Sequence, residues 1–227
     1  VAEVTQIKGD SETHPDLSPE DEFADFEQFN FYLQAFPQAR GYQIQKGDTA
    51  RSALKNGLEV EADIGVNPFK FGMIGSTDAD TSLATADSDN FYGKFKDSEP
   101  SVNRLDNKMG GSLWPNRDLA ASGYAAVWAK DNTREEIYDA LARREVYAST
   151  GPRMAVRFFG GWEFTSKDLD NREPVFAGYG KGVPMGSDLP KAPAAGKAPT
   201  FLVAAMQDAI GGNLDRIQII NDHAQMV

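Results

Sequence analysis

The sequence predicts an α/β fold over residues 1–150, followed by a smaller β-rich region over residues 151–227. Segments with strand-like and helix-like patterns alternate up to residue 150, which is the order found in α/β layers and barrels. After the Ser-Thr-Gly-Pro run at 149–152, strand-like runs follow one another without a helix signal of comparable strength. We therefore place a boundary near residue 151.

The first expected elements are a strand and a phenylalanine-rich helix. Residues 1–7 alternate weakly in hydrophobicity and predict a buried strand, which is followed by a loop. A helix is expected to begin at Ser18, because Ser18 can cap it, Pro19 suits the first helical position and acidic residues follow. Its apolar face, which we expect in the core, extends through about Phe36 and contains Phe23, Phe26, Phe29 and Leu33.

A second helix and a short buried strand are expected next. The helix runs from Thr49 to Gly57 or a little beyond. The strand lies within 68–75, between a proline and a Gly-Ser-Thr-Asp turn. The long polar stretch 85–120 is expected to be functional or to contact a partner, because structureless loops of this length are uncommon inside compact domains.

The last elements of the α/β part are two strands on either side of a helix. An apolar strand is expected at 124–128 and another at 146–148. Between them, Thr133 and Glu136 have the spacing of a capping box, which predicts the start of a helix.

The β-rich part contains three expected strands, around 154–159, 201–206 and 217–219, each with apolar residues in a run or in alternation. The intervening stretch 178–199 holds five Gly and four Pro. This composition predicts a loop or linker.

Composition and charge exclude several classes of function. The formal net charge of −11 and the pI near 4.7 disfavour unassisted binding to nucleic acid or to an anionic membrane, since both need clustered Lys and Arg. No run of residues approaches the roughly 18 apolar residues of a membrane span. The sequence has no Cys and only two His, so thiolate zinc sites are excluded and any metal site must rely on oxygen ligands.

The start of the chain leaves its compartment open. It has neither an initiator Met nor the basic start and apolar stretch of a signal peptide, and it opens in a strand-like run. These features indicate a fragment or a processed product. A soluble protein is expected, with both a cytoplasmic and an exported, periplasmic location compatible with the sequence. An incomplete barrel would expose strand edges, so a homo-oligomer is also expected.

The strongest candidate site is the turn 75–80, directly after an expected strand. Barrel enzymes place functional groups at the carboxyl ends of strands, where the chain leaves the sheet. Asp78 and Asp80 are two residues apart, so both side chains would point the same way on an extended backbone. They could bind one divalent cation or bridge a pair of cations. The alternative is an ordinary turn in which Asp78 bonds its own backbone.

A second candidate site is the stretch 9–14, after the first expected strand. The carboxylate of Glu12 and the imidazole of His14 are two residues apart, which suits a Zn, Mn or Fe site. The alternative is a kink at His14-Pro15, with Glu12 capping a nearby element. Glu3, within the first strand, is a further candidate for an inward-pointing carboxylate.

Four stretches of the chain resemble one family. They are residues 3–15, 66–79, 132–136 and 147–153, which read EVTQIKGDSETHP, VNPFKFGMIGSTDA, NTREE and YASTGPR. The family is a large uncharacterised one, a domain of unknown function, whose members contain a PHP (polymerase and histidinol phosphatase) metal-hydrolase module. The resemblance runs through nearly the whole chain. It implies part of a distorted PHP-like α/β barrel followed by a smaller β-rich, sandwich-like region.

The resemblance also implies roles for particular residues. Asp78 matches the aspartate of the family's late Asp-x-His metal motif, while Glu12 and His14 fall in its Gly-Asp-Ser-Glu stretch. Glu3 matches the strand glutamate that PHP proteins use as a metal ligand. Where the family pattern has His, this chain has Asp80, which favours Mg, Mn or Ca over Zn. The early His-x-His of PHP modules has no counterpart, so the chain resembles the C-terminal part of the family.

Three functions follow as expectations. The first is metal-dependent hydrolysis of a small phosphorylated or otherwise anionic substrate, with Mn, Mg or Zn polarising the phosphoryl oxygen and activating water. The second is a non-catalytic binding or assembly module that retains the fold, which the missing His-x-His and the carboxylate at position 80 favour. A carbohydrate-binding protein is a third reading, based on aromatic residues such as Trp162 and Phe164. The implied metal ligands are Asp78, Glu12 and His14, with Asp80 and Glu3 as secondary ligands.

Overall fold

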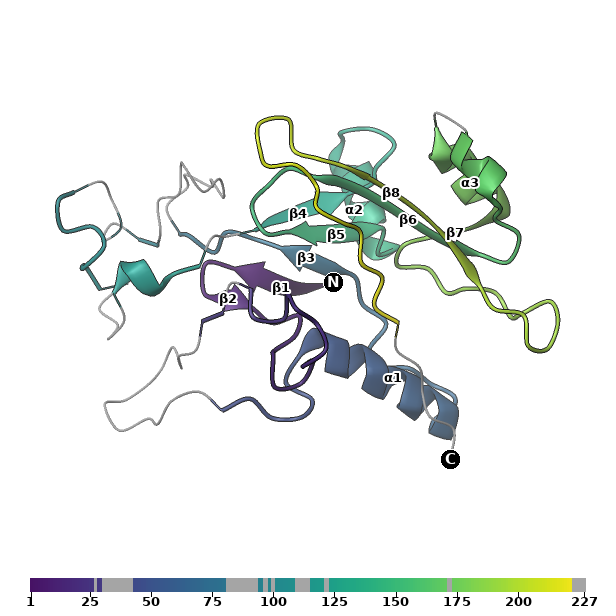
Figure 1. The fold of residues 1–227 in the computed structure, drawn as a ribbon, viewed down its shortest axis with the longest axis horizontal. Coiled ribbons are helices and arrows are strands. Elements are labelled where there is room, and N and C mark those ends of the chain that lie inside the picture. Colours follow the sequence, from purple (N-terminus) through teal and green to yellow (C-terminus); the bar gives the residue numbers. More distant parts are fainter. Residues whose placement is uncertain are drawn as a thin grey trace.

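The computed structural model of the chain describes residues 1–26, 28–29, 43–80, 94–95, 98, 101–108, 115–120, 123–170 and 173–221. In these residues three small sheets are combined with three α-helices and the short 3₁₀ helices η3 (Asn116–Asp118) and η4 (Ser166–Asp170) (Figure 1). The mixed α/β class is therefore confirmed. The described strands form no closed barrel, so the barrel that the family resemblance implies is not confirmed.

The first sheet joins the start of the chain to the segment after helix α1. It has the order β2-β1-β3 and consists of β1 (Ala2–Gln6), β2 (Gly9–Asp10) and β3 (Met73–Gly75). Strands β1 and β2 are antiparallel and joined by a tight turn, where Gly9 has a φ of 91° that favours glycine. Strands β1 and β3 are parallel. The chain therefore leaves β1 and β3 at the same edge of the sheet, which is where the sequence predicts a site.

Helix α1 (Ala50–Ile64) lies below the first sheet in Figure 1 and begins where it is predicted. Thr49 caps it, because the Thr49 side chain accepts a hydrogen bond from Ser52 N at 3.3 Å. The helix continues past the buried Gly57 and ends at Gly65, which has a left-handed φ of 77°. Backbone hydrogen bonds from its first turn to the loop after β2 fix the helix to the first sheet.

The second sheet is antiparallel, and all of its elements agree with the predictions. They are β4 (Tyr124–Val127), α2 (Arg134–Ala142) and β5 (Val146–Ser149), with α2 connecting the two strands. Thr133 caps α2 by accepting a hydrogen bond from Glu136 N at 3.3 Å. Strand β3 lies beside this sheet, since a Cβ added to Gly75 would lie within 3.0 Å of carbonyl oxygens of β4 and β5. The two sheets therefore pack closely enough to require glycine there.

The third sheet is antiparallel and has the order β7-β6-β8. Its strands are β6 (Ala155–Gly161), β7 (Gly182–Pro184) and β8 (Thr200–Met206), and helix α3 (Pro174–Lys181) lies between β6 and β7 in the chain. Phe159, Phe164 and Leu202 form its core, and side chains of α3 pack against them. Because Phe164 is buried there, it is not available to stack on a sugar. The described part of the C-terminal region forms one sheet with a helix rather than a sandwich.

Helix α3 and strand β7 correct the expectation of a loop over 178–199. Their glycines are packing positions. A Cβ on Gly178 would lie 2.6 Å from the ring of Phe159, and one on Gly182 would lie 2.3 Å from the carbonyl oxygen of Gly160. The high glycine content therefore does not indicate a loop over 178–184. Glycine is also required where a backbone packs closely against a ring or another backbone. Residues 185–199 do form a loop.

The helix expected from Ser18 is not formed over the described residues 19–26, which form successive turns. The Ser18 hydroxyl does not cap a helix, because it bonds the Thr13 hydroxyl at 2.6 Å. Phe23 and Phe26 are exposed instead of lying in the core. The rest of this predicted helix, from residue 27 to about Phe36, lies largely outside the described residues.

The strand expected around 217–219 is also not formed, and residues 212–221 have no regular structure. Side chains hold this segment to the N-terminal part of the chain, because Arg216 pairs with Glu22 and its guanidinium carbon lies 5.2 Å from the centre of the Phe23 ring. No described strand is hydrogen-bonded alongside the segment.

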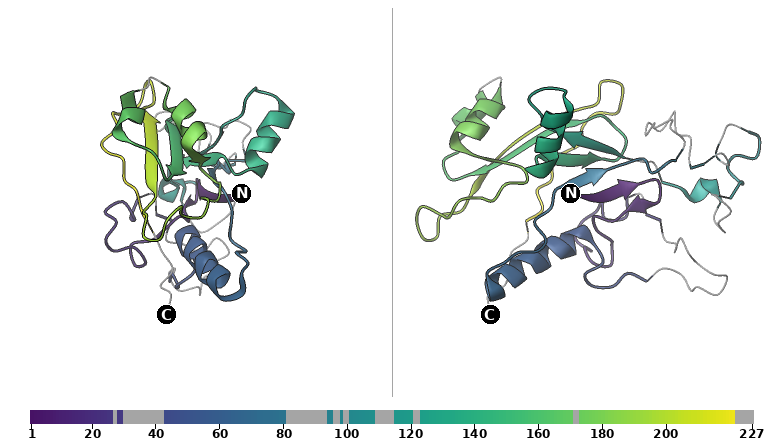
Figure 2. Two further views of the ribbon diagram at one scale, coloured as in Figure 1. Left: turned by 90° about the vertical axis from the view of Figure 1, so that its right-hand side faces the viewer. Right: turned by 180° about the vertical axis from the view of Figure 1, so that it is seen from behind.

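The helices lie at the periphery of the molecule. Figure 2 shows α1 on one side of the sheets and α3 on the other. The longest of them, α1, has 15 residues. Across the described ranges, no helix combines the length and the apolar character needed to cross a bilayer.

Candidate functional site

The candidate site lies at the edge where the chain leaves the parallel strands β1 and β3. Backbone hydrogen bonds join the two exits, from Ser76 N to Thr5 O at 3.0 Å and from Ile7 N to Thr77 O at 3.4 Å. The loop after β3 is thereby held against the turn after β1. This contact brings Lys8 of the β1–β2 turn to the same place as the predicted carboxylates.

Asp78 and Asp80 do converge, but through a different backbone conformation from the expected one. Both residues have positive φ angles, 47° and 57°, in the left-handed region. Aspartate tolerates this region better than most residues because its short polar side chain can bond locally. The convergence therefore comes from a tight loop rather than from the alternation of an extended strand.

The ammonium group of Lys94 lies between the two carboxylates. Its Nζ donates to Asp78 Oδ1 at 2.9 Å, to Asp80 Oδ2 at 2.5 Å and to the main-chain carbonyl oxygen of Asp78. The Lys94 side chain is only 7% exposed. The hydrogen bond from Lys94 lowers the pKa of Asp80. Three oxygens of two aspartates thus surround one positively charged nitrogen.

A second ammonium group, that of Lys8, forms an ion pair with Asp78 Oδ2. Burial and the nearby Lys94 ammonium lower the pKa of Lys8 to about 8, with Glu3 and Asp80 acting in the opposite direction. Asp78 is therefore held by two cations, one on each carboxylate oxygen.

Glu3 extends from β1 to the same edge of the sheet. Its Oε2 accepts a hydrogen bond from the Ser76 hydroxyl at 2.7 Å, and its Oε1 accepts one from Gln6 Nε2 at 2.5 Å. Glu3 therefore contacts the loop that carries Asp78 and Asp80. The prediction that it belongs to the same site is compatible with this placement.

Glu12 has a different partner, the guanidinium of Arg51 on helix α1. Arg51 Nε donates to Glu12 Oε1 at 2.8 Å, and Arg51 Nη1 donates to Asp21 Oδ2 at 2.7 Å. The backbone N–H of Glu12 donates to Asp10 Oδ1 at 2.5 Å, while burial raises the pKa of Asp10 to about 6. These contacts tie the loop after β2 to helix α1.

His14 takes part in the local turn that follows. Its Nδ1 accepts a hydrogen bond from Asp16 N at 3.1 Å, and its carbonyl oxygen accepts bonds from Leu17 N and Ser18 N at 2.9 Å. This arrangement corresponds to the alternative reading of a loop kink. Within the part of the chain that the structure describes, no group of three or more His, Asp or Glu side chains is placed to hold a metal ion.

Neither Lys8 nor Lys94 is among the site residues that the sequence predicts. Lys8 directly follows the expected strand 1–7 and lies in the turn between β1 and β2, so its position at the end of a strand is a usable signal. Lys94 belongs to the long polar stretch that we expected to be functional or in contact with a partner. Its approach to Asp78, 16 residues earlier, depends on the path of the chain and on the bond from Phe95 N to Ala79 O at 3.0 Å.

Comparison with known proteins gives one match. The model of a family described as "Protein of unknown function (DUF3604)" matches residues 1–226. Neither a curated protein nor a solved structure matches the chain.

Proposed function

The chain belongs to the DUF3604 family, and we propose that it acts as a metal-dependent hydrolase of the PHP phosphoesterase type. The description of the family names no activity. The PHP-type activity rests on the resemblance of the four stretches quoted above and on the geometry at the ends of β1 and β3. The observation that carries the proposal is that the carboxylates of Asp78 and Asp80 converge on one positively charged group, the ammonium of Lys94.

The donor atoms that Asp78 and Asp80 bring to this edge are oxygens, the kind of ligand that a hard divalent cation takes. Asp78 and Asp80 would hold the ion, since their carboxylate oxygens already lie 2.9 and 2.5 Å from one cationic nitrogen. A site made of carboxylate and carbonyl oxygens favours Mg²⁺, Mn²⁺ or Ca²⁺ as the bound ion, rather than Zn²⁺. When bound, such an ion supplies Lewis acidity toward a phosphoryl oxygen and lowers the pKa of a bound water.

The other side chains of the site have roles that follow from their charge. The Lys8 ammonium would offset the negative charge of a phosphorylated or otherwise anionic substrate at the same edge. The hydrogen bond between Ser76 and Glu3 would fix the position of the Glu3 carboxylate at the rim. Glu12 and His14, the other ligands that the resemblance implies, stay outside this proposal, because they lie on the loop after β2 and bond Arg51 and the backbone of Asp16 rather than the loop of Asp78 and Asp80.

Hydrolysis of a generic aryl phosphate tests the proposal. The full chain is stripped with a chelator and assayed after addition of Mn²⁺, Mg²⁺ or Zn²⁺. Turnover is expected with Mn²⁺ or Mg²⁺. Asp78→Ala should lower it by at least about 100-fold, because even groups that only orient metal ligands contribute about 10–100-fold.

Asp188→Ala is the matched control for that experiment. Asp188 is also an aspartate paired with a lysine, Lys70, but it lies on the loop after β7. Its replacement should leave turnover unchanged. Absence of metal-stimulated turnover, or equal rates for Asp78→Ala and the unchanged chain, would falsify the proposal.

A non-catalytic binding or assembly module is the second candidate function. It is favoured by a specific observation, namely that lysine ammonium groups already neutralise both aspartates of the site. Self-association through sheet edges is the expected activity of such a module. If size-exclusion chromatography shows an oligomer that Asp78→Ala leaves intact while no metal-dependent turnover is found, this function is supported.

A further inference from the structure

The Lys94 side chain occupies the position at which the two aspartates would hold a metal ion. An ammonium group has three N–H donors. The three acceptors around Lys94 Nζ, two from Asp78 and one from Asp80, match this number. The ammonium is therefore fully satisfied by the oxygens that would serve as metal ligands.

The local backbone holds Lys94 in this position. Lys94 N donates to the Ser98 hydroxyl at 2.8 Å, and that hydroxyl donates back to Lys94 O at 2.8 Å. Both Lys94 and Ser98 are buried. The lysine thus enters the site from an anchored turn rather than as a surface side chain with many rotamers.

The aspartates are more accessible than the lysine that binds them. The side chains of Asp78 and Asp80 are 29% and 52% exposed, against 7% for Lys94. An ion arriving from solvent can therefore reach the exposed side of the carboxylates, whereas the Lys94 ammonium contacts their buried side. A divalent ion at the inner position would meet the ammonium at short distance, and two cations repel strongly there.

We infer that the Lys94 ammonium is a built-in cation that competes with a divalent metal ion for Asp78 and Asp80. The inference rests on the proposed function for the identity of the competing ion. Metal binding then requires the ammonium to leave the two carboxylates. Removing the charge at position 94 frees Asp80 and Oδ1 of Asp78 for the metal, while Lys8 keeps its ion pair with Oδ2 of Asp78.

Binding of Mn²⁺ alone, followed by electron paramagnetic resonance of the free ion, tests this inference without an activity assay. Lys94→Gln removes the charge and keeps a hydrogen-bond donor toward the aspartates. It should bind Mn²⁺ at least about tenfold more tightly than the unchanged chain, because the repulsion between charges a few ångströms apart is lost. Adding Asp78→Asn to this variant should abolish the gain.

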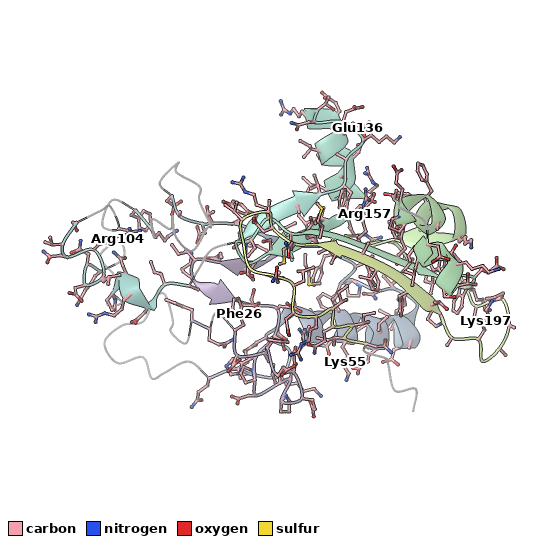
Figure 3. The ribbon with its side chains drawn as sticks, turned by 45° about the horizontal axis from the view of Figure 1, so that its top comes forward. Phe26, Lys55, Arg104, Glu136, Arg157 and Lys197 are labelled. Atoms are coloured by element: carbon pink, nitrogen blue, oxygen red, sulfur yellow. The ribbon has the colours of Figure 1, made fainter. Side chains whose placement is uncertain are left out.

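Lys197→Gln is the matched control, since it makes the same charge change on the exposed loop before β8, at the far end of the third sheet in Figure 3. It should leave Mn²⁺ affinity unchanged. Circular dichroism establishes that each variant is folded. Should Lys94→Gln not fold, Lys94→Met, which preserves the length of the aliphatic stem, replaces it in the same comparison.

The outcomes separate this inference from the proposed function. Equal Mn²⁺ affinity in the unchanged chain and the Lys94 variant overturns the inference and leaves the proposed function standing. Tight binding by the Lys94 variant alone, with no metal-dependent turnover by the unchanged chain, supports the inference and contradicts the proposed function. Absence of binding in both overturns the two together.

Discussion

Two regions of this molecule hold carboxylates with cations, and they differ in how completely the carboxylates are enclosed. At the ends of β1 and β3, Asp78 and Asp80 are partly exposed and bind lysines. At the start of β5, Glu145 has a side chain only 3% exposed and binds arginines and a tyrosine. The comparison separates a site that can exchange its partners from one that cannot.

The Glu145 cluster joins several elements of the fold. Glu145 Oε2 accepts a hydrogen bond from Arg143 Nε at 2.8 Å, and Oε1 accepts from Arg157 Nη1 at 3.3 Å and from the Tyr179 hydroxyl. The guanidinium carbon of Arg157, labelled in Figure 3, lies 3.4 Å from the centre of the Trp128 ring. The cluster therefore links the second sheet to β6 and α3, and both carboxylate oxygens are occupied.

The difference shows that exposure, rather than charge, distinguishes the candidate site. Removing a partner from a buried carboxylate leaves a charge without compensation, which is costly. Removing one from a half-exposed aspartate leaves a charge that water can solvate, so stability changes little. The two regions should therefore respond differently to mutation. Changes around Glu145 should lower stability strongly, whereas changes at Asp78 and Asp80 should mainly affect ion binding.

The largest effect on stability is expected for Glu145→Ala. Loss of the carboxylate leaves Arg143, Arg157 and the Tyr179 hydroxyl without their shared acceptor. The free energy of unfolding should fall by about 3 kcal/mol, at the lower end of values for buried ion pairs because the arginines are partly exposed. Urea denaturation measures the change. Glu135→Ala on the exposed surface of α2 is the control. An equal loss of unfolding free energy in both variants would show that the Glu145 cluster stabilises the fold no more than an exposed glutamate does.

Gly178→Ala should have the next largest effect, because α3 presents Tyr179 to this cluster. The added Cβ would lie 2.6 Å from ring atoms of Phe159, which is 1% exposed and has no room to move. We expect a loss of about 2 kcal/mol from overpacking. Gly180→Ala, in the same helix with no atom within 4 Å of its added Cβ, should instead gain up to about 1 kcal/mol from helix propensity. Similar behaviour of the two variants in urea denaturation would contradict the packing described here.

Asp168 is a third carboxylate paired with a cation, and its contribution to stability should depend on pH. The hydrogen bond from Lys181 Nζ at 2.5 Å, aided by one from Thr165 N at 2.8 Å, lowers its pKa. A lowered folded-state pKa means that its contribution to stability is present above the unfolded-state pKa, about 3.9, and is lost as the pH falls through the folded-state value. Asp168→Asn should therefore destabilise the chain more at pH 7 than at a pH below the unfolded-state pKa. Thermal melts at the two pH values measure this, and an equal difference at both would rule it out.

The smallest effect on stability is expected for Asp80→Asn. The Asp80 side chain is half exposed, and the amide can still accept a hydrogen bond from Lys94. The midpoint of thermal unfolding should stay within experimental error of the unchanged chain, while Mn²⁺ binding weakens. A loss of stability as large as that of Glu145→Ala would mean that the site is a structural ion pair.

Much of the fold could be predicted because its signals are local. The caps Thr49 and Thr133 mark the starts of α1 and α2, and the strands near 1–7, 124–128 and 201–206 follow apolar patterns. Helix α3 was missed because its glycines serve tertiary packing. The helix from Ser18 was wrongly predicted over the described residues because side-chain partners elsewhere compete for the capping groups.

The candidate site could be predicted only in part. Asp78 and Asp80 do lie together, but through left-handed backbone conformations rather than through the extended alternation that their spacing predicts. The contact of Glu3 with the same loop follows from its place on β1. The pairing with Lys94 could not be foreseen, since it depends on how a long polar stretch returns to the sheet. The pairing of Glu12 likewise depends on Arg51 from α1, whose approach is a tertiary feature, whereas His14 bonds the backbone of its own turn.

A crystal structure grown with Mn²⁺ would show whether Asp78 and Asp80 hold the metal, because the anomalous signal locates the ion independently of activity. We expect a peak in contact with carboxylate oxygens of both Asp78 and Asp80, with the Lys94 ammonium displaced from between them. A peak at Glu12 and His14, or an ordered Lys94 still bridging the aspartates at saturating Mn²⁺, would contradict it.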